Sequence, residues 1–404
     1  MDINTIRRHF PLLSRKINGK PVVYFDNACS SLRPLPVLRA MEEYYRDFPA
    51  CGGRSMHKLG EIVTQKVEEA RGIIAKFIHA RRKEEIIFTR NTTESINLIA
   101  HSMGFKQGDV ILTTDKEHNS NLIPWQILAE KIGIIHLIVP SRKDNTFDLE
   151  RFESMMNDSV KLVSMGQTSN LDGVSIPAEA IIKIAHRHGA KVLLDAAQAA
   201  PHRPIDVTRL DVDFLAFSGH KMLGPSGTGV LYGKYALLDA LEPFLVGGDT
   251  VEYSTYESHK FLPLPEKFEA GLQNYAGIIG FGAAIQYLND IGFSYIARQE
   301  RELNQFITET LTKIPGLTLM GSHDPALRSG IVSFCIEGID SHQIALILDQ
   351  TANIMIRSGQ HCVHSWFSAH KIKGSARASL YFYNTLEEAQ LFVDCMNKII
   401  LLHR

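Results

Sequence analysis

The sequence lacks the features that would place a protein in a membrane, outside the cell or on nucleic acid. It contains no run of about 18 apolar residues, the length that a transmembrane helix needs. The residues from Met1 to Arg8 have no apolar stretch typical of a secretion signal. The 43 Lys and Arg residues are balanced by 44 Asp and Glu residues, which gives no electrostatic basis for binding nucleic acid or an anionic membrane. We therefore expect a cytoplasmic protein with neither of these partners.

Cysteine is also scarce, and its pattern excludes two structural uses. The chain has five cysteines, an odd and scattered set without a CxxC pair, so we expect neither a disulfide framework nor a zinc site, and no other metal. Cys335 and Cys395 lie in apolar runs and are expected to be small core residues. Cys29, Cys51 and Cys362 lie beside Gly, Ser, Arg or His in loop-like sequence, where a thiol is accessible.

Repeats, low-complexity tracts and Pro/Ser linkers are absent as well, and the 404 residues suit two folded domains. Between about residues 65 and 235, helical patterns alternate with short apolar runs, which indicates strands buried on both faces and a three-layer α/β domain with a mainly parallel seven-stranded sheet. The runs are 85–89, 110–113, 134–139, 160–164, 191–195, 214–217 and 229–232.

The pattern changes after about residue 290. A long helical segment, two apolar strands and a last helix with a Thr-x-x-Glu capping signal predict a smaller α+β domain. These segments are 296–314, 330–334, 378–382 and 385–402. We place the large domain at residues 15–285, and the small domain at residues 1–14 and 286–404, with the loop 355–362 in it.

Two strands of the predicted sheet end in residues that carry chemistry. The run 191–195 delivers the Asp195 carboxylate, and the run 214–217 is followed by Ser218, His220 and Lys221. Ligands of parallel sheets bind beyond the carboxyl ends of the strands. A buried carboxylate and a nearby lysine are what pyridoxal 5'-phosphate (PLP) requires, as a partner for its pyridinium nitrogen and as its Schiff-base anchor. Read singly, Asp195 could be a helix cap and Lys221 a solvated loop residue.

Other segments offer further candidates, each with a simpler structural alternative. Thr92 and Thr93 open a helix after a strand, where a phosphate dianion can bind, although a threonine there can also serve only as a cap. His118 follows another strand and could stack on a cofactor ring or be a surface histidine.

The loop of the small domain holds a candidate nucleophile. Cys362 follows His361 and lies five residues after Arg357, a setting that can lower a thiol pKa, although an inert thiol is the alternative. Arg357 and Arg377 could each bind a carboxylate through two hydrogen bonds, or could form structural ion pairs.

Taken together, these segments resemble the class V enzymes of PLP fold type I, and within them the group II cysteine desulfurases, which are related to selenocysteine lyases. The resemblance covers nearly the whole chain. It is carried by 24–28, 91–98, 117–125, 169–173, 195–198, 218–221, 268–271, 357–362 and 377–380. In group II an Arg-x-Gly-x-His-Cys loop, here Arg357 to Cys362, carries the nucleophile.

The resemblance implies a role for each matching residue. Lys221 would anchor PLP and move protons, Asp195 would pair with the pyridinium nitrogen, and Gln198 would hydrogen-bond the phenolic oxygen. His118 would stack on the ring, and Cys362 would take the sulfur as a persulfide. The phosphate would be bound by Thr92, Thr93, Ser218 and His220, and the substrate by Arg377 and Asn170, with Arg357 and His57 as further candidates. Either His361 or His57 could tune the thiol or relay a proton.

The resemblance therefore predicts a homodimer that converts L-cysteine to L-alanine and passes sulfur on, with an acceptor protein as a candidate partner. Selenocysteine lyase activity, another lyase or epimerase reaction, and a catalytically silent scaffold are the alternatives. A nicotinamide-binding dehydrogenase is disfavoured because no GxGxxG opens the first βα unit.

Three positions depart from the family pattern. Leu272 stands where a threonine usually reaches the phosphate in the partner subunit. Cys29 and Cys51 add thiols near the expected site, either as inert small residues, as sulfur relays or as marks of another substrate.

Overall fold

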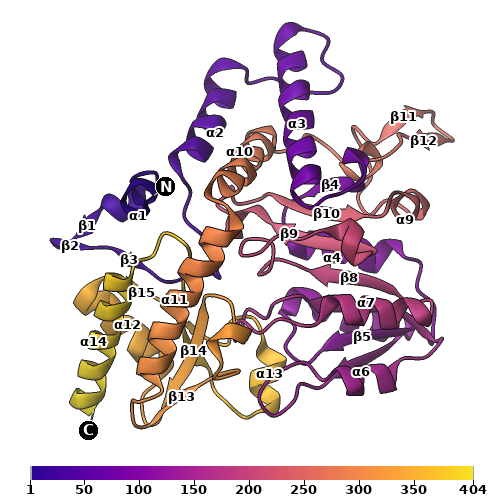
Figure 1. Ribbon diagram of the computed structural model, residues 1–404. Coiled ribbons are helices and arrows are strands. Elements are labelled where there is room, and N and C mark those ends of the chain that lie inside the picture. Colours follow the sequence, from indigo (N-terminus) through magenta and orange to yellow (C-terminus); the bar gives the residue numbers. More distant parts are fainter. Residues whose placement is uncertain (1, 404) are drawn as a thin grey trace.

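The computed structural model describes residues 2–403, and its two largest β-sheets lie side by side (Figure 1). The larger sheet has seven strands in the order β4-β10-β9-β8-β7-β5-β6, and only β10 runs antiparallel to its neighbours. Its strands are β4 (Ile86–Thr89), β5 (Val110–Thr114), β6 (Ile135–Val139), β7 (Val160–Gly166), β8 (Lys191–Asp195), β9 (Phe214–Ser218) and β10 (Gly229–Gly233). The predicted mainly parallel seven-stranded sheet is confirmed.

Alternate residues of these strands enter different hydrophobic cores, as the two-residue period of a strand requires. In β8, Val192 and Leu194 belong to one core and Leu193 to the other. Strand β6 is an exception, because it lies at the edge of the sheet and exposes Ile135 and Ile138. The expectation that all seven strands are buried on both faces is therefore wrong for β6.

Helices cover both faces of this sheet and complete the three-layer domain. Ile74 of α3 and Phe281 of α10 belong to the core on one face, whereas Ile96 of α4 and Trp125 of α5 belong to the core on the other. The helices of this part are α2 (Leu35–Asp47), α3 (Lys58–Phe77), α4 (Thr92–Ser102), α5 (Ile123–Ile132), α6 (Leu149–Met155), α7 (Ala178–Arg187), α8 (Val207–Leu210), α9 (Tyr235–Ala240) and α10 (Tyr275–Ile291).

The smaller sheet is antiparallel, with the order β13-β14-β17-β16. Thr385 and Glu388 form the predicted capping box at the start of the last helix. The strand expected at 378–382 instead spans 375–379, because the residues after Ser379 are buried but leave the ladder. These elements are α11 (Phe293–Leu311), β13 (Leu317–Leu319), β14 (Ile331–Ile336), α12 (Ser341–Ala352), β16 (Arg357–Gly359), α13 (His364–Ala369), β17 (Ser375–Ser379) and α14 (Leu386–His403).

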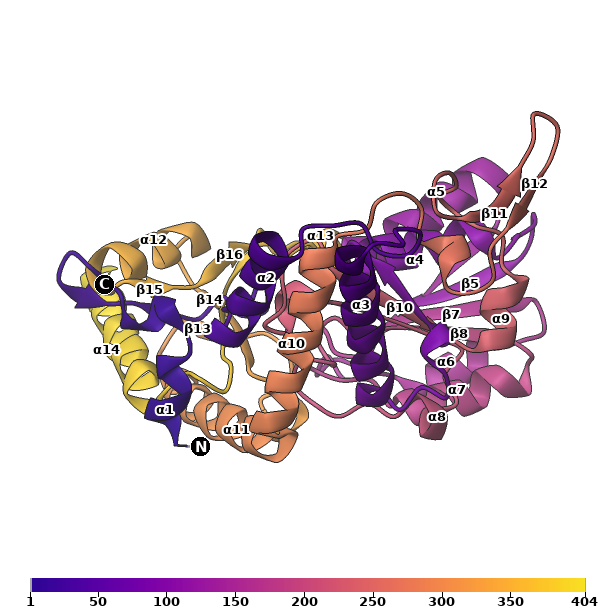
Figure 2. The same cartoon turned by 90° about the horizontal axis from the view of Figure 1, so that it is seen from above.

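The N-terminal residues lie against this smaller part, where Arg7 of α1 forms an ion pair of 2.7 Å with Glu388. Seen from above, α13 lies between the two parts and the β11–β12 hairpin projects at the far end (Figure 2). The domain boundaries stay a prediction. The remaining helices and strands are α1 (Ile3–Arg8), β1 (Lys16–Ile17), β2 (Lys20–Pro21), β3 (Val23–Tyr24), β11 (Val251–Ser254), β12 (His259–Phe261) and β15 (Ile354–Met355), with 3-10 turns η1 (Pro11–Ser14), η2 (Lys83–Glu85), η3 (Asn119–Asn121), η4 (Gly219–Lys221), η5 (Glu266–Phe268) and η6 (Pro325–Leu327).

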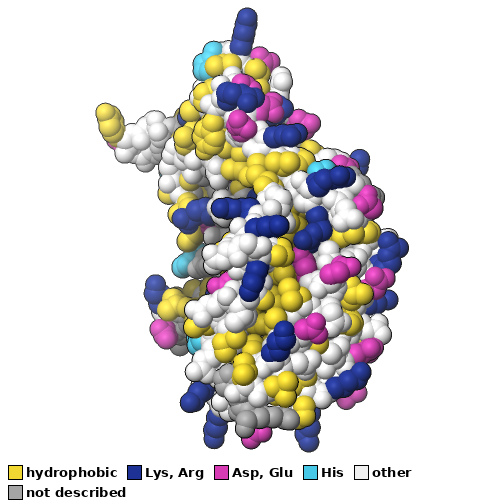
Figure 3. All heavy atoms as spheres, turned by 90° about the vertical axis from the view of Figure 1, so that its left-hand side faces the viewer, with side chains coloured by type: hydrophobic (Ala, Val, Ile, Leu, Met, Phe, Trp, Pro, Cys, Tyr) yellow, Lys and Arg dark blue, Asp and Glu magenta, His cyan; other side chains and the backbone are white. Residues whose placement is uncertain are grey.

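Basic and acidic side chains are interspersed on the face shown in Figure 3. Within residues 2–403, no helix is long and apolar enough to cross a membrane.

Candidate functional site

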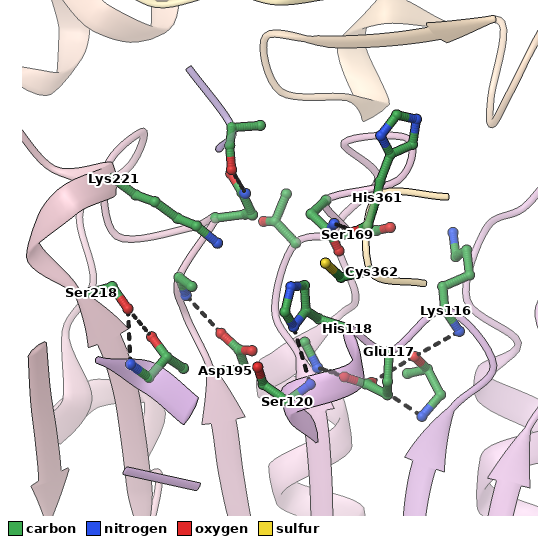
Figure 4. Close-up of a pocket in the computed structure, with 18 of the residues that line it drawn as sticks. Lys116, Glu117, His118, Ser120, Ser169, Asp195, Ser218, Lys221, His361 and Cys362 are labelled. Carbon is green, nitrogen blue, oxygen red and sulfur yellow. Dashed lines mark hydrogen bonds between the residues drawn. The ribbon is translucent and has the colours of Figure 1, made fainter. Parts of the chain in front are cut away.

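A cavity of about 270 Å³ lies at the carboxyl edge of the large sheet, under the β16–α13 loop (Figure 4). Its floor comes from the segments that follow β4, β5, β7, β8 and β9, and its roof from the 357–362 loop, β17 and the turn at Ala28 and Cys29. All predicted site residues except His57 line this one cavity. They are Thr92, Thr93, His118, Asn170, Asp195, Gln198, Ser218, His220, Lys221, Arg357, Cys362 and Arg377.

Asp195 and Lys221 place opposite charges at neighbouring strand ends. One carboxylate oxygen of Asp195 accepts a hydrogen bond of 2.9 Å from the Ala197 N–H, and the carboxylate has no ion pair within 4 Å among the described residues. Burial raises the pKa of Asp195, and the Lys221 charge opposes that rise. Burial lowers the pKa of Lys221, and the Asp195 charge counteracts it. The pair thus presents a buried acid and a partly buried amine, and each can bind a group of the opposite charge.

The start of α4 forms an oxygen-rich cradle beside this pair. Asn91 caps the helix by accepting a hydrogen bond of 3.0 Å from Glu94. The Thr92 hydroxyl lies 2.7 Å from the Ser218 hydroxyl, and Thr93 lies 2.7 Å from Ser120. Helix N–H groups and hydroxyls together suit a phosphate dianion. Ser120 was part of the 117–125 motif, but the sequence alone assigned it no role.

His118 is a neutral imidazole with a defined tautomer. Burial, with Lys221 and Arg377 nearby, lowers its pKa to about 3. Nδ1 accepts a hydrogen bond of 3.1 Å from the Ser120 N–H, so the proton of the neutral ring lies on Nε2. In the view of Figure 4 the ring lies between Asp195 and Cys362, and it lines the cavity.

Gln198 has an unsatisfied polar atom at the cavity. Its Nε2 donates to the Ala28 carbonyl at 2.7 Å, while its buried Oε1 has no hydrogen-bond partner in the described chain. A phenolic oxygen that is ionised needs a donor, and the second N–H of the Gln198 Nε2 can supply it while the first stays on the Ala28 carbonyl. Buried polar groups are nearly always satisfied, so the Gln198 Oε1 marks a place for an additional donor at the cavity.

Glu117 is a functional candidate that the sequence alone did not single out. It is fully buried below His118, accepts hydrogen bonds from Thr114, Asn121 and the Gly166 N–H, and burial raises its pKa to about 7. Its Oε2 accepts a 2.7 Å hydrogen bond from Asn121. Glu117 lines the cavity, and its hydrogen bonds fix the turn that carries His118. In the sequence, only its position directly before His118 points to this role.

Arg357 and Arg377 occupy directly opposed positions of the β16–β17 ladder. Arg377 is 2% exposed, and its Nη1 donates to the Asn170 carbonyl at 2.8 Å while Asp26 lies 3.5 Å away. The Nε of Arg377 is buried without a partner in the described chain. Like charges at opposed ladder positions repel. Two guanidinium groups so placed favour the binding of an anion such as a carboxylate.

The loop that carries Cys362 is held in an unusual backbone conformation. His361 and Cys362 both have left-handed φ angles, 50° and 60°, which cost energy for residues other than glycine. The Cys362 carbonyl accepts a hydrogen bond of 2.7 Å from the Asn119 N–H, and the His361 carbonyl accepts one of 2.7 Å from Asn170. Both bonds tie the loop of the small sheet to the floor of the cavity.

A small hydrophobic cluster anchors the same loop from behind. Val363, Trp366 and Phe367 pack with Leu171 and Met320. His361 points away from the thiol and lies 2.8 Å from Ser375, and burial lowers the pKa of His361 to about 2, with Arg377 and Arg357 adding to that effect. His361 is thus neutral at working pH and gives Cys362 no positive charge.

Three residues singled out in the sequence lie outside the cavity. His57 is exposed and caps α3 by accepting a hydrogen bond of 3.2 Å from Gly60. Cys51 is exposed, and so is Leu272, at 70%. In residues 2–403, no cluster of three His, Cys, Asp or Glu residues could hold a metal ion.

The sheet has the topology of fold type I of the PLP-dependent enzymes, and a lysine and a carboxylate lie at its carboxyl edge as in that fold. The aminotransferase class-V family matches residues 23–392, and the chain belongs to that family. It is 42% identical to a probable cysteine desulfurase of Halalkalibacterium halodurans over 98% of both chains. It resembles the apo structure of a cysteine desulfurase from Thermococcus onnurineus NA1 (TM-score 0.95, 41% identity, 99% of both chains). It also resembles the crystal structure of the cysteine desulfurase CsdA, in an S-sulfonic acid form, from Escherichia coli (TM-score 0.92, 31% identity, 100% of both chains).

Proposed function

We propose that this protein is a PLP-dependent cysteine desulfurase, which converts L-cysteine to L-alanine and retains the sulfur as a persulfide on Cys362. The observation that carries the proposal is the presence of Cys362, the opposed arginines and the Asp195–Lys221 pair around one cavity. Relatives named cysteine desulfurase or probable cysteine desulfurase, at about 40% identity over nearly the whole chain, support it.

The residues present fit the cofactor. Lys221 supplies the amine, Asp195 the carboxylate for a ring nitrogen, His118 an aromatic face, and the start of α4 with Ser218 the phosphate cradle. When bound, PLP withdraws electrons from the amino acid and so labilises bonds at its Cα and Cβ. Among the described residues the Lys221 amine forms no hydrogen bond or ion pair, and this free amine next to the Asp195 charge is the observation that the fit explains.

The chain itself then has three tasks. Arg377, with Asn170 beside it, binds the substrate carboxylate and fixes its orientation. Lys221 carries protons to and from the substrate carbons through its Nζ. The Cys362 sulfur forms a bond to the substrate sulfur as the Cβ–S bond breaks. The sum is L-cysteine plus Cys362 thiol giving L-alanine plus Cys362 persulfide, which balances without an external oxidant.

The test uses reduced protein loaded with PLP and compares the wild type with Cys362→Ala and Lys221→Ala. We expect alanine and a Cys362 peptide heavier by one sulfur atom in the wild type only, and loss of the visible absorbance of the lysine-bound cofactor in Lys221→Ala. Parallel kinetics with L-selenocysteine measures the preference between the two amino acids. Full alanine production by Cys362→Ala would contradict the proposal.

We further propose that the protein is a homodimer and that a separate protein accepts its sulfur. Apolar side chains exposed on α2 and α3, together with Leu272, support a second copy as the occupant of that face. They are Leu38, Tyr45, Leu59 and Ile62. Light scattering of the purified protein tests the dimer. The cytoplasmic location stays a prediction.

A further inference from the structure

The cavity contains a second thiol, Cys29, that the proposed reaction does not use. Cys29 lies in the turn after β3, where its N–H donates to the Asp26 carbonyl at 3.1 Å. The neighbouring Ala28 is fixed on both sides, by the Ser379 hydroxyl at 2.9 Å and by Gln198 at 2.7 Å. Cys29 is therefore held at the cavity wall by a constrained backbone rather than by a loose loop.

The surroundings of Cys29 are cationic. The Arg357 Nη1 donates a hydrogen bond to the Cys29 sulfur at 3.0 Å. Lys221 interacts electrostatically with the sulfurs of both Cys29 and Cys362, and Arg377 with that of Cys29. The two sulfurs thus share one charged neighbour, although they come from residues 333 positions apart in the chain (362 − 29).

A second observation shows that this part of the cavity is built to receive an anion. The Nε of Arg377 is buried and has no partner among the described residues, and Arg377 faces Arg357 across the ladder. Of the five cysteines, only Cys29 and Cys362 line the cavity. Arg357, which was expected to bind substrate, instead donates its hydrogen bond to the Cys29 sulfur. Its positive charge would stabilise a thiolate or a persulfide anion on Cys29.

We propose that Cys29 is a second sulfur-accepting residue, which takes the outer sulfur from the Cys362 persulfide. The inference rests on the proposed desulfurase function. The Cys29 thiolate attacks the outer sulfur, a new S–S bond forms on Cys29, and the S–S bond on Cys362 breaks. Cys362 leaves as a thiolate, so charge and electrons balance without an oxidant. Cys362 is then free to accept sulfur from a second substrate while the first sulfur stays on Cys29.

The experiment counts alanine and locates sulfur in PLP-loaded enzyme with excess L-cysteine and no reductant or acceptor. We expect about two alanines per subunit in the rapid phase of the wild type and about one in Cys29→Ser, because each persulfide accounts for one turnover. After alkylation, mass spectrometry of the peptides should find one added sulfur on Cys29 and on Cys362. Cys395→Ser, which changes a thiol outside the cavity, is the matched control and should behave as the wild type.

Two further variants separate the possible failures. In Cys362→Ala, neither alanine nor a Cys29 persulfide should form. In Arg357→Gln, the ratio of Cys29 to Cys362 persulfide should fall. A Cys362 persulfide with no sulfur on Cys29 and equal alanine counts in the wild type and Cys29→Ser would overturn the inference and leave the desulfurase intact. A Cys29–Cys362 disulfide with release of sulfide would also overturn it. The absence of alanine in the wild type would instead reject the proposed function.

Discussion

Replacing Arg377 by lysine tests the carboxylate site most directly. Arg377 reaches the cavity from the buried strand β17, and one of its nitrogens is already committed to the Asn170 carbonyl at 2.8 Å. A lysine keeps the charge but not the fork, so it cannot contact Asn170 and also bind a carboxylate through two hydrogen bonds. Each lost charge-assisted hydrogen bond is worth about 1.5–3 kcal/mol. Since about 1.4 kcal/mol is a factor of ten, kcat/KM for L-cysteine should fall about 10- to 100-fold.

The assay is steady-state alanine formation, with absorbance of the bound cofactor measured in parallel. Cofactor binding should be retained in Arg377→Lys, because the cradle at Thr92 and Ser218 is untouched. Arg328→Lys is the matched control, since Arg328 is also buried, lies outside the cavity and contacts Thr308. We expect this control to keep its kcat/KM. A KM and kcat/KM within about twofold of the wild type in Arg377→Lys would refute the assignment of the carboxylate site, because even one lost charge-assisted bond exceeds that change.

Three further predictions concern the scaffold. Glu269→Gln should lower the free energy of unfolding by about 1.5–3 kcal/mol in urea, because the buried Arg71, now 2.7 Å from that carboxylate, loses a charge-assisted pair and keeps only the partly exposed Glu68, 3.0 Å away, as its counter-charge; a loss below about 1 kcal/mol would contradict this. Gly229→Ala should weaken PLP binding, measured by cofactor titration, because the added Cβ would lie 2.6 Å from the Asn91 Cα and displace the start of α4. An unchanged affinity would show that the phosphate cradle does not depend on the close contact between Gly229 and Asn91. Burial lowers the pKa of His136 to about 4, so between about pH 6.5 and 4 the unfolded chain binds one more proton than the folded chain, and stability falls as the pH drops through that window. His136→Gln should reduce this slope of unfolding free energy against pH by up to about 1.4 kcal/mol per pH unit, measured by denaturation at several pH values. An unchanged slope would exclude the effect.

The sequence predicts the large sheet well because each of its strands is a short apolar run between polar segments. The same signal misleads in two places. The run at 134–139 is apolar although β6 lies at the sheet edge, where Ile135 and Ile138 stay exposed. Residues 380–382 are buried, yet they leave the ladder after Ser379. Hydrophobicity favours burial, but the neighbouring strands decide where pairing ends and which strand lies at the exposed edge of the sheet.

The site follows the same division. That Asp195 and Lys221 meet could be predicted, because carboxyl ends of parallel strands share one edge of a sheet. The contact between Arg357 and Cys29 could not, since it depends on how the small sheet lies over a turn more than 300 residues away in sequence. The register that opposes Arg357 to Arg377, and the left-handed backbone at Cys362, are likewise set by tertiary contacts.

Several costs to stability coincide at this one cavity. Arg377 is buried opposite a like charge, Lys221 is held where burial lowers its pKa, and Gln198 keeps an unsatisfied oxygen. The backbone at His361 and Cys362 adds strain. Such costs persist only where the surrounding structure enforces them, here through Asn119, Asn170 and the cluster around Trp366. A ligand with a carboxylate, a phosphate and an electron-poor ring supplies partners for these uncompensated groups. The features that destabilise the free protein therefore make binding selective.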